Sequence, residues 1–254
     1  MRLSFVLISV LFFVTNAFAA NVVTVTPIAD SMTRALLADT PVSVTYLPPK
    51  RLPINRIPSW LSKHRSDPLE AFDAIVNISS MRPELSFYTS IRSGNIHTVP
   101  IDIAEALLPG GERVAVQEPD EYFWLNSNNA LLMLGILKRD LSLLWPEYAS
   151  KIAYQHQILG QTLRQITLDI DDVLLESNYE AIVNRNKSTQ PFTKGLLLPV
   201  FTEQDSIDLA SLNILIISGQ GKSNQWMVDD FSRYSDTGFI DRWKSTLNNL
   251  KALK

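Results

Sequence analysis

The chain has 254 residues, and 23 Lys and Arg against 26 Asp and Glu leave a formal net charge of −3. Nearly balanced charge argues against a nucleic-acid partner, because such a partner needs a concentrated basic face. The chain has no cysteine, which excludes disulfides, thiolate zinc sites, iron–sulfur clusters and cysteine nucleophiles. With 46% hydrophobic and 19% charged residues, the composition is that of a folded globular protein with a substantial core.

Residues 1–20 have the pattern of a secretory signal peptide. Arg2 precedes an apolar run that extends from Leu3 to Val14, and Ala17-Phe18-Ala19 then offers the small residues of a cleavage site. The apolar run is shorter than the roughly 20 residues that a membrane-spanning helix needs. We therefore expect the mature chain to be exported to a bacterial periplasm.

The first part of the mature chain alternates strand-like and helical stretches. Strands are predicted at 21–26, 42–47, 72–78 and 96–101, and helices at 27–38 and 128–144. Pro146 should end the second of these helices. Strands separated by helical stretches are typical of βα units, so we expect a parallel sheet.

The segment from Tyr148 to about Glu176 contains no proline, and Gly160 is its only glycine. Its apolar residues recur every three or four positions, which predicts one helix of about eight turns. Such a helix is either a member of a bundle or a connection between two lobes. Strands are predicted after it at 179–183 and 213–218, and a last helix at 239–253.

Short segments taken in chain order carry a family resemblance. They are Val22-Val-Thr-Val-Thr-Pro27, Leu47-Pro48-Pro49, Asp73-Ala-Ile-Val-Asn77, Asp120-Glu-Tyr-Phe-Trp124-Leu-Asn126, Pro146-Glu-Tyr148 and Phe239-Ile-Asp-Arg-Trp243. In this order and spacing they resemble the periplasmic zinc/manganese-binding proteins of bacterial ABC importers. The resemblance implies an α/β fold of two lobes with mainly parallel sheets, joined by one long rigid helix.

The resemblance also divides the chain. It implies an N-terminal α/β lobe at 21–146, a linking helix at 147–176 and a C-terminal α/β lobe at 177–254, shortened relative to the family. In that family a metal ion sits between the lobes, and the loaded protein docks on a membrane permease. Zinc or manganese is therefore the cargo that the resemblance implies.

The family's histidine ligands are missing from the positions where the resemblance places them. The first histidine should follow Pro53, where Ile54 stands, and the second should occupy the position of Tyr122. The third should lie just after the strand at 181–183, where Asn184, Arg185 and Asn186 are found. Isoleucine cannot coordinate a metal, and neutral tyrosine and asparagine are weak ligands for zinc.

A late carboxylate of the family matches Asp236. With Asp236 and Asn55, which neighbours Ile54, the three substituted positions form our predicted ligand-binding set in the cleft: Ile54, Asn55, Tyr122, Asn186 and Asp236. The identity of any metal stays open. The histidines present, His64, His97 and His156, do not pair at metal-ligand spacing.

Other chemistry finds little support in the sequence. Gly219-Gln-Gly221-Lys222-Ser223 resembles the end of a phosphate-binding loop, but Ile216 stands where the full motif needs a glycine. The acidic group Glu118, Asp120 and Glu121 could attract a cation or a basic partner. No Gly-x-Ser-x-Gly motif is present, and we do not expect an enzyme.

Two functional hypotheses follow. In the first, the chain is the periplasmic solute-binding component of a metal-type ABC importer, and it captures a metal ion, a metal chelate or a small solute between its lobes. Its partner would be an ABC permease of the inner membrane, and we expect a monomer. In the alternative, the chain is a degenerate homologue that binds no metal, and its fold serves as a protein-interaction or accessory module.

Overall fold

The computed structural model describes residues 20–105, 113–115, 121–202, 205, 211–219 and 224–253. Three sequence predictions fall outside these residues: the signal peptide up to residue 19, the acidic residues Glu118 and Asp120, and the motif residues Gly221-Lys222-Ser223. In the described part of the chain, no helix has the length and apolar character needed to cross a membrane.

The first sheet has four parallel strands in the order β2-β1-β3-β4. The strands are β1 (Asn21–Thr24), β2 (Ser43–Tyr46), β3 (Ala74–Asn77) and β4 (Val99–Asp102). Val22 pairs with Val44 on one side and with Ala74 on the other, and its side chain is fully buried. The β-branched run of β1 therefore suits a central strand that is covered on both faces.

Helix α1 (Pro27–Leu36) begins directly after β1 because the sequence supplies a start signal there. Thr26 accepts a hydrogen bond from the Ala29 N–H, and Pro27 fits the first turn, where its missing N–H costs nothing. Two shorter helices complete this lobe: α2 (Ile57–Lys63) and α3 (Tyr88–Gly94).

The second sheet is also parallel, and its strand order is β6-β5-β7-β8. Its strands are β5 (Ala181–Asn184), β6 (Val200–Thr202), β7 (Ile214–Ser218) and β8 (Trp226–Met227). The helices of this lobe are α6 (Gln190–Thr193) and α7 (Phe239–Lys251). The sequence predicted β5, β7 and α7, but it did not predict β6 and β8, which are too short to show a periodic pattern.

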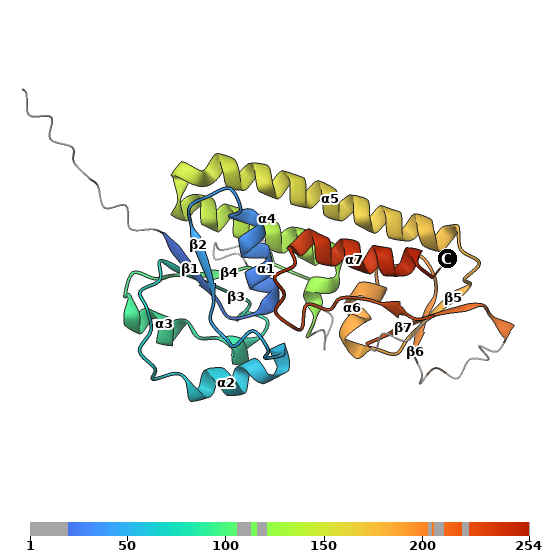
Figure 1. Cartoon of the computed structure of the whole chain (residues 1–254), viewed down its shortest axis with the longest axis horizontal. Helices are drawn as coiled ribbons and strands as arrows, with labels where there is room; N and C mark the ends of the chain where they lie inside the picture. Colours follow the sequence, from blue (N-terminus) through green and yellow to red (C-terminus); the bar gives the residue numbers. More distant parts are fainter. Residues whose placement is uncertain are drawn as a thin grey trace, which may run out of the picture.

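One long helix connects the lobes, and another helix precedes it in the chain. Helix α4 (Ser127–Leu144) ends before Pro146, and α5 (Ala149–Leu175) follows after one short 3₁₀ turn. Figure 1 shows α5 along one side of the molecule, passing over α4 and α7 from the first lobe to the second. These features confirm the predicted fold class, which is α/β with two mainly parallel sheets and one long helix.

Candidate functional site

The two lobes contact each other through loops that follow the strands. The Ile54 N–H donates a hydrogen bond to the Ser232 carbonyl at 2.7 Å, and the Trp124 indole N–H donates to the Asp230 carbonyl at 3.1 Å. We call this region the interlobe seam and define it by Ile54, Tyr122, Trp124, Asn186, Ser188 and residues 230–232. The carboxyl ends of parallel strands are where such folds place ligands.

Ile54 contributes an apolar side chain to the seam. It lies in the 3₁₀ turn at Ile54–Arg56 and is 1% exposed, whereas its neighbour Asn55 is exposed to solvent. The contact that Ile54 makes across the lobes uses its backbone N–H and not its side chain. This position therefore supplies no metal ligand.

Tyr122 is half-buried just before the 3₁₀ turn at Phe123–Leu125, and its ring centroid lies 5.2 Å from that of Trp124. Burial raises the pKa of the Tyr122 phenol, and the negative charge of Asp230 raises it further. The phenol is therefore protonated at neutral pH, which makes it a hydrogen-bond donor and not an anionic ligand.

Asn186 caps the 3₁₀ turn at Lys187–Thr189 in the second lobe. Its side-chain oxygen accepts a hydrogen bond from the Ser188 N–H at 3.2 Å. The Ser188 hydroxyl lies 2.8 Å from the Asn186 side-chain oxygen and 2.8 Å from the Asp230 carboxylate, so it can donate to either one. Asn186 and Asp230 thus belong to one polar group that includes a single carboxylate.

Asp230 is a seam residue that the sequence analysis did not single out. It follows β8 by a few residues, and its side chain also accepts a hydrogen bond from the Ser232 N–H at 2.9 Å. Its strand, β8, has two residues and was not predicted, so the sequence held no signal that places Asp230 at the end of a parallel strand.

Asp236 lies in a different contact between the lobes, at the solvent-exposed surface. Its carboxylate pairs with Lys50 at 3.1 Å and accepts a hydrogen bond from the Tyr234 hydroxyl at 2.8 Å. These two partners, the tyrosine first, lower the pKa of Asp236. The Tyr234 ring in turn lies 4.8 Å from the ring of Tyr46. The structure does not bring Asp236 into the hydrogen-bonded group of Asn186 and Asp230.

The seam residues do not fit a zinc or manganese ion. Among the residues that the structure describes, no three His, Cys, Asp or Glu side chains are grouped so that they could hold a metal. The histidines lie elsewhere: His64 stacks on Trp60, His97 is exposed, and His156 lies on α5 next to Gly135 of α4. Hydroxyl, amide and one carboxylate favour hydrogen bonding over tight zinc coordination.

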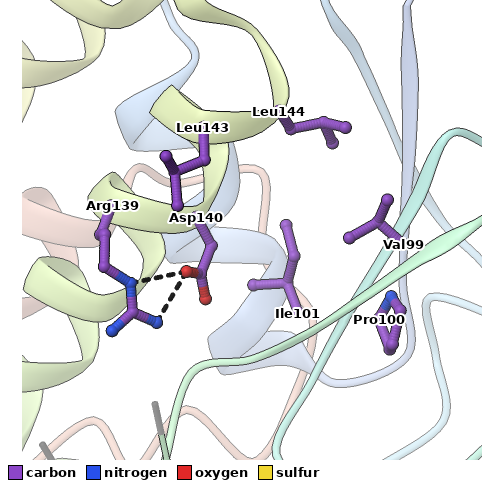
Figure 2. A pocket seen from close by; sticks show the side chains of 7 residues that line it. All are labelled: Val99, Pro100, Ile101, Arg139, Asp140, Leu143 and Leu144. Atoms are coloured by element: carbon purple, nitrogen blue, oxygen red, sulfur yellow. Dashed lines mark hydrogen bonds and ion pairs between the residues drawn. The ribbon is translucent and has the colours of Figure 1, made fainter. Parts of the chain in front are cut away.

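Two hollows lie in the first lobe. One has a volume of about 350 Å³ and lies between β4 and the end of α4. Figure 2 shows its apolar lining side chains and the Arg139–Asp140 ion pair beside them. The other, of about 450 Å³, lies at the ends of β3 and β4 and includes Asp102. Asp102 accepts hydrogen bonds from the backbone of Ser80 and Ala104, so it already serves to hold these loops together.

The two parallel sheets, the helix that spans them and the seam between them define the fold of a two-lobe solute-binding protein. Among solved structures, the chain is similar to YcdH, a metal-dependent lipoprotein from Bacillus subtilis, with a TM-score of 0.61 and 14% identity over 92% of this chain and 98% of that one. It is similar to the laminin-binding protein Lbp of Streptococcus pyogenes, with a TM-score of 0.61 and 11% identity over 93% of this chain and 100% of that one.

Zn(II)-bound AdcA from Streptococcus pneumoniae is similar with a TM-score of 0.58 and 13% identity over 92% of this chain. This chain spans only 57% of the length of AdcA. No protein-family model and no curated protein matches the sequence. At these identities the likeness is one of fold, and at that level it confirms the predicted resemblance to zinc/manganese-type solute-binding proteins.

Proposed function

We propose that this chain is the periplasmic solute-binding component of a metal-type ABC importer, and that it captures a metal chelate or a small polar solute between its lobes. The observation that carries the proposal is the composition of the seam. Ile54 is buried and apolar, Tyr122 is a protonated phenol, and Asn186 is an amide bonded to Ser188. These groups suit a ligand that is recognised by hydrogen bonds and not by coordination.

The seam also sets the charge of the ligand that it would accept. Asp230 is its carboxylate, while Tyr122 supplies a donor and Asn186 an amide. A neutral or cationic solute with both donors and acceptors would satisfy these groups, as would a chelate that presents them at its surface. The partner in this proposal is a permease of the inner membrane, the chain is exported by its signal peptide, and no reaction is involved.

Thermal melting of the metal-stripped protein tests the cargo. Free zinc and free manganese should leave the melting temperature unchanged, whereas one of a set of metal chelates or polar solutes should raise it. A ligand at about 100 times its Kd stabilises by about 2.7 kcal/mol, which is easily measured. A clear rise with a free ion would overturn the choice of cargo.

A reconstructed metal site tests whether the seam is the ligand position. The triple variant Ile54→His, Tyr122→His and Asn186→His leaves Asp230 in place and restores the imidazoles that the resemblance implies. It should gain a zinc-dependent rise in melting temperature that the natural chain lacks. The matched control replaces Ile54→His with Asn55→His, because Asn55 is exposed next to the seam, and it should gain much less.

The alternative function is that of an interaction module whose cleft is permanently closed. It is favoured by one observation: the lobes are hydrogen-bonded directly to each other at Ile54–Ser232 and at Trp124–Asp230. Small-angle X-ray scattering with and without candidate ligands distinguishes ligand capture from the closed interaction module. Ligand capture predicts a change in the radius of gyration, while the closed module predicts none for every ligand tested.

A further inference from the structure

Two stretches of the chain contain several basic residues and no acidic residue. Residues 40–66 include five Lys and Arg, and residues 181–202 include three, although the whole chain has a formal net charge of −3. The first stretch contains β2 and α2, and the second contains β5 and α6, so each includes the loop at the carboxyl end of a strand in its lobe. Like charges gathered in one region create a potential that attracts the opposite charge.

The two stretches meet at residues 230–232 of the interlobe seam. The Ile54 N–H donates to the Ser232 carbonyl at 2.7 Å, and the Ser188 hydroxyl lies 2.8 Å from the Asp230 carboxylate. Basic residues next to these contacts therefore surround this part of the seam from both lobes: Arg51 and Arg56 from the first lobe, and Lys187 and Arg233 from the second.

Helix α2 extends this basic surface away from the seam. Arg56 and Lys63 are seven residues apart, so they lie on the same face of the helix, about 10 Å apart along its axis. Another face of α2 carries Ile57 and Leu61, which are buried. Arg65 follows directly after the helix, and Figure 1 shows α2 on the side of the first lobe that is far from α5.

These six basic residues, which we call the basic rim, are all exposed: Arg51, Arg56, Lys63, Arg65, Lys187 and Arg233. Within the described part of the chain, none of them has a carboxylate partner at ion-pair distance, whereas their neighbour Lys50 pairs with Asp236 at 3.1 Å. Arg233 Nη1 donates to the Arg51 carbonyl at 3.5 Å, which brings two of the positive charges close together across the lobes. A partner with negative charge would relieve this repulsion.

We propose that the basic rim binds an acidic segment of a partner protein that contacts both lobes. Four of the six residues are arginines, whose planar guanidinium groups match carboxylates in two-point hydrogen bonds. A membrane surface fits less well, because proteins that lie on membranes also insert apolar side chains, and no large apolar side chain is exposed between residues 50 and 66. The proposal holds for both functions considered above, since each includes a protein partner.

Fluorescence anisotropy with a labelled peptide tests the proposal. The probe is a ten-residue peptide of alternating Glu and Ser, and its control alternates Gln and Ser. At about 10 mM salt the Debye length is about 30 Å, so the charges of the rim act together. The protein without the predicted signal peptide should bind the Glu peptide and not the Gln peptide, and its affinity should fall as salt is added. Absence of binding to the Glu peptide at this salt concentration would overturn the proposal.

Neutral variants locate the binding surface. Arg56→Gln combined with Lys63→Gln should raise the Kd for the Glu peptide about tenfold, because two neighbouring charges of the rim are removed. The matched control is Lys244→Gln combined with Lys251→Gln, which removes the same charge from exposed positions of α7 and should change the Kd less than about twofold. Unchanged melting temperatures show that both variants are folded. Equal weakening in both would show attraction by net charge alone and would rule the rim out.

Two further measurements test the extent of the surface and the class of partner. Lys187→Gln combined with Arg233→Gln removes charges of the second lobe and should also weaken peptide binding, and an unchanged Kd would contradict a contact with both lobes. Vesicles of phosphatidylcholine and phosphatidylglycerol should not retain the protein in a sedimentation assay at about 150 mM salt, where the Debye length is about 8 Å. Retention that Arg56→Gln with Lys63→Gln abolishes would make an anionic membrane the occupant and would overturn the proposal.

Discussion

Arg242 shows how burial decides what a charged residue does in this protein. Its side chain is 5% exposed, and its Nε and Nη2 atoms donate to the two oxygens of Asp229 at 2.7 and 2.6 Å. The guanidinium also lies 3.9 Å above the ring of Phe231, a residue with the unusual φ of 55°. The ion pair therefore holds the strained residue that lies between Asp230 and Ser232 of the seam.

We expect Asp229→Ala to lower the free energy of unfolding by about 2–4 kcal/mol, because it leaves a buried guanidinium without its partner. This loss of stability is smaller than that expected for a fully buried ion pair, since 33% of the Asp229 side chain is exposed. Urea unfolding of the variant measures the loss. The control is Asp236→Ala, which removes the exposed partner of Lys50 and should leave the midpoint unchanged. Equal losses in both variants would contradict the prediction.

Trp124 allows a second test at the level of one residue. Trp124→Phe removes the indole N–H and leaves the Asp230 carbonyl without its partner, which should cost about 1–3 kcal/mol. Trp226→Phe is the matched control, because the Trp226 indole donates to Thr246 within the second lobe. Both should be less stable, but amide exchange at Ile54 should accelerate only in Trp124→Phe. Equal acceleration in both would show that the two lobes do not separate there.

At the scale of elements, the glycines at 160 in α5 and at 94 in α3 differ in the space that surrounds them. A Cβ atom at Gly160 would lie 3.5 Å from Arg164 and 3.7 Å from Leu131, which is ordinary contact. A Cβ atom at Gly94 would lie 2.9 Å from the backbone oxygens of Glu70 and Leu69, which is a clash. The two glycines therefore have different roles, although both lie in helices.

We expect Gly160→Ala to stabilise the protein by about 0.5–1 kcal/mol, because alanine is the better helix former and no neighbour has to move. Gly94→Ala should destabilise it. Thermal or urea unfolding of the two variants beside the natural chain provides the measurement. A loss of stability in Gly160→Ala would mean that α4 and α5 pack more closely than the structure shows.

The same pair of helices should give the stability a dependence on pH. Burial first, then Lys138 and Arg164, lowers the pKa of His156 below its ordinary value of 6.5. The unfolded chain therefore takes up the proton first, and stability is lost as the pH falls from about 6.5 through the lower pKa of the folded state. His156→Gln should reduce the loss between about pH 7 and pH 5, while the exposed His97→Gln should not. An unchanged slope in His156→Gln would contradict this.

Sequence periodicity predicted some of these elements much better than others. Helix α5 could be predicted because its 27 residues repeat one buried stripe many times. Strands β6 and β8 could not, because three and two residues contain no period. Pro100 lies in β4, at the edge of the first sheet. The N–H of the preceding Val99 donates to the Asp73 carbonyl, just before β3, so the backbone nitrogen of Pro100 points away from β3. Because proline has no N–H to offer there, it protects the open edge of the sheet.

At the scale of the whole molecule, the seam joins residues that are far apart in the sequence. The family resemblance pointed to Ile54, Tyr122 and Asn186. The Asp230 carbonyl, in contrast, accepts its hydrogen bond from Trp124, which lies 106 residues away in the sequence. No local sequence pattern predicts such a contact. The lobe boundaries at 146 and 177 and the ligand-binding role of the five predicted residues stay predictions.

The position of Trp124 gives the lobes a natural optical reporter. Trp124 is fully buried at the seam, and its indole N–H donates across the two lobes to the Asp230 carbonyl. When the lobes separate, its indole passes from an apolar, hydrogen-bonded setting into water, which shifts tryptophan emission to longer wavelengths. Intrinsic fluorescence, with Trp124→Phe as the blank, would therefore record opening and closing in solution without any attached label.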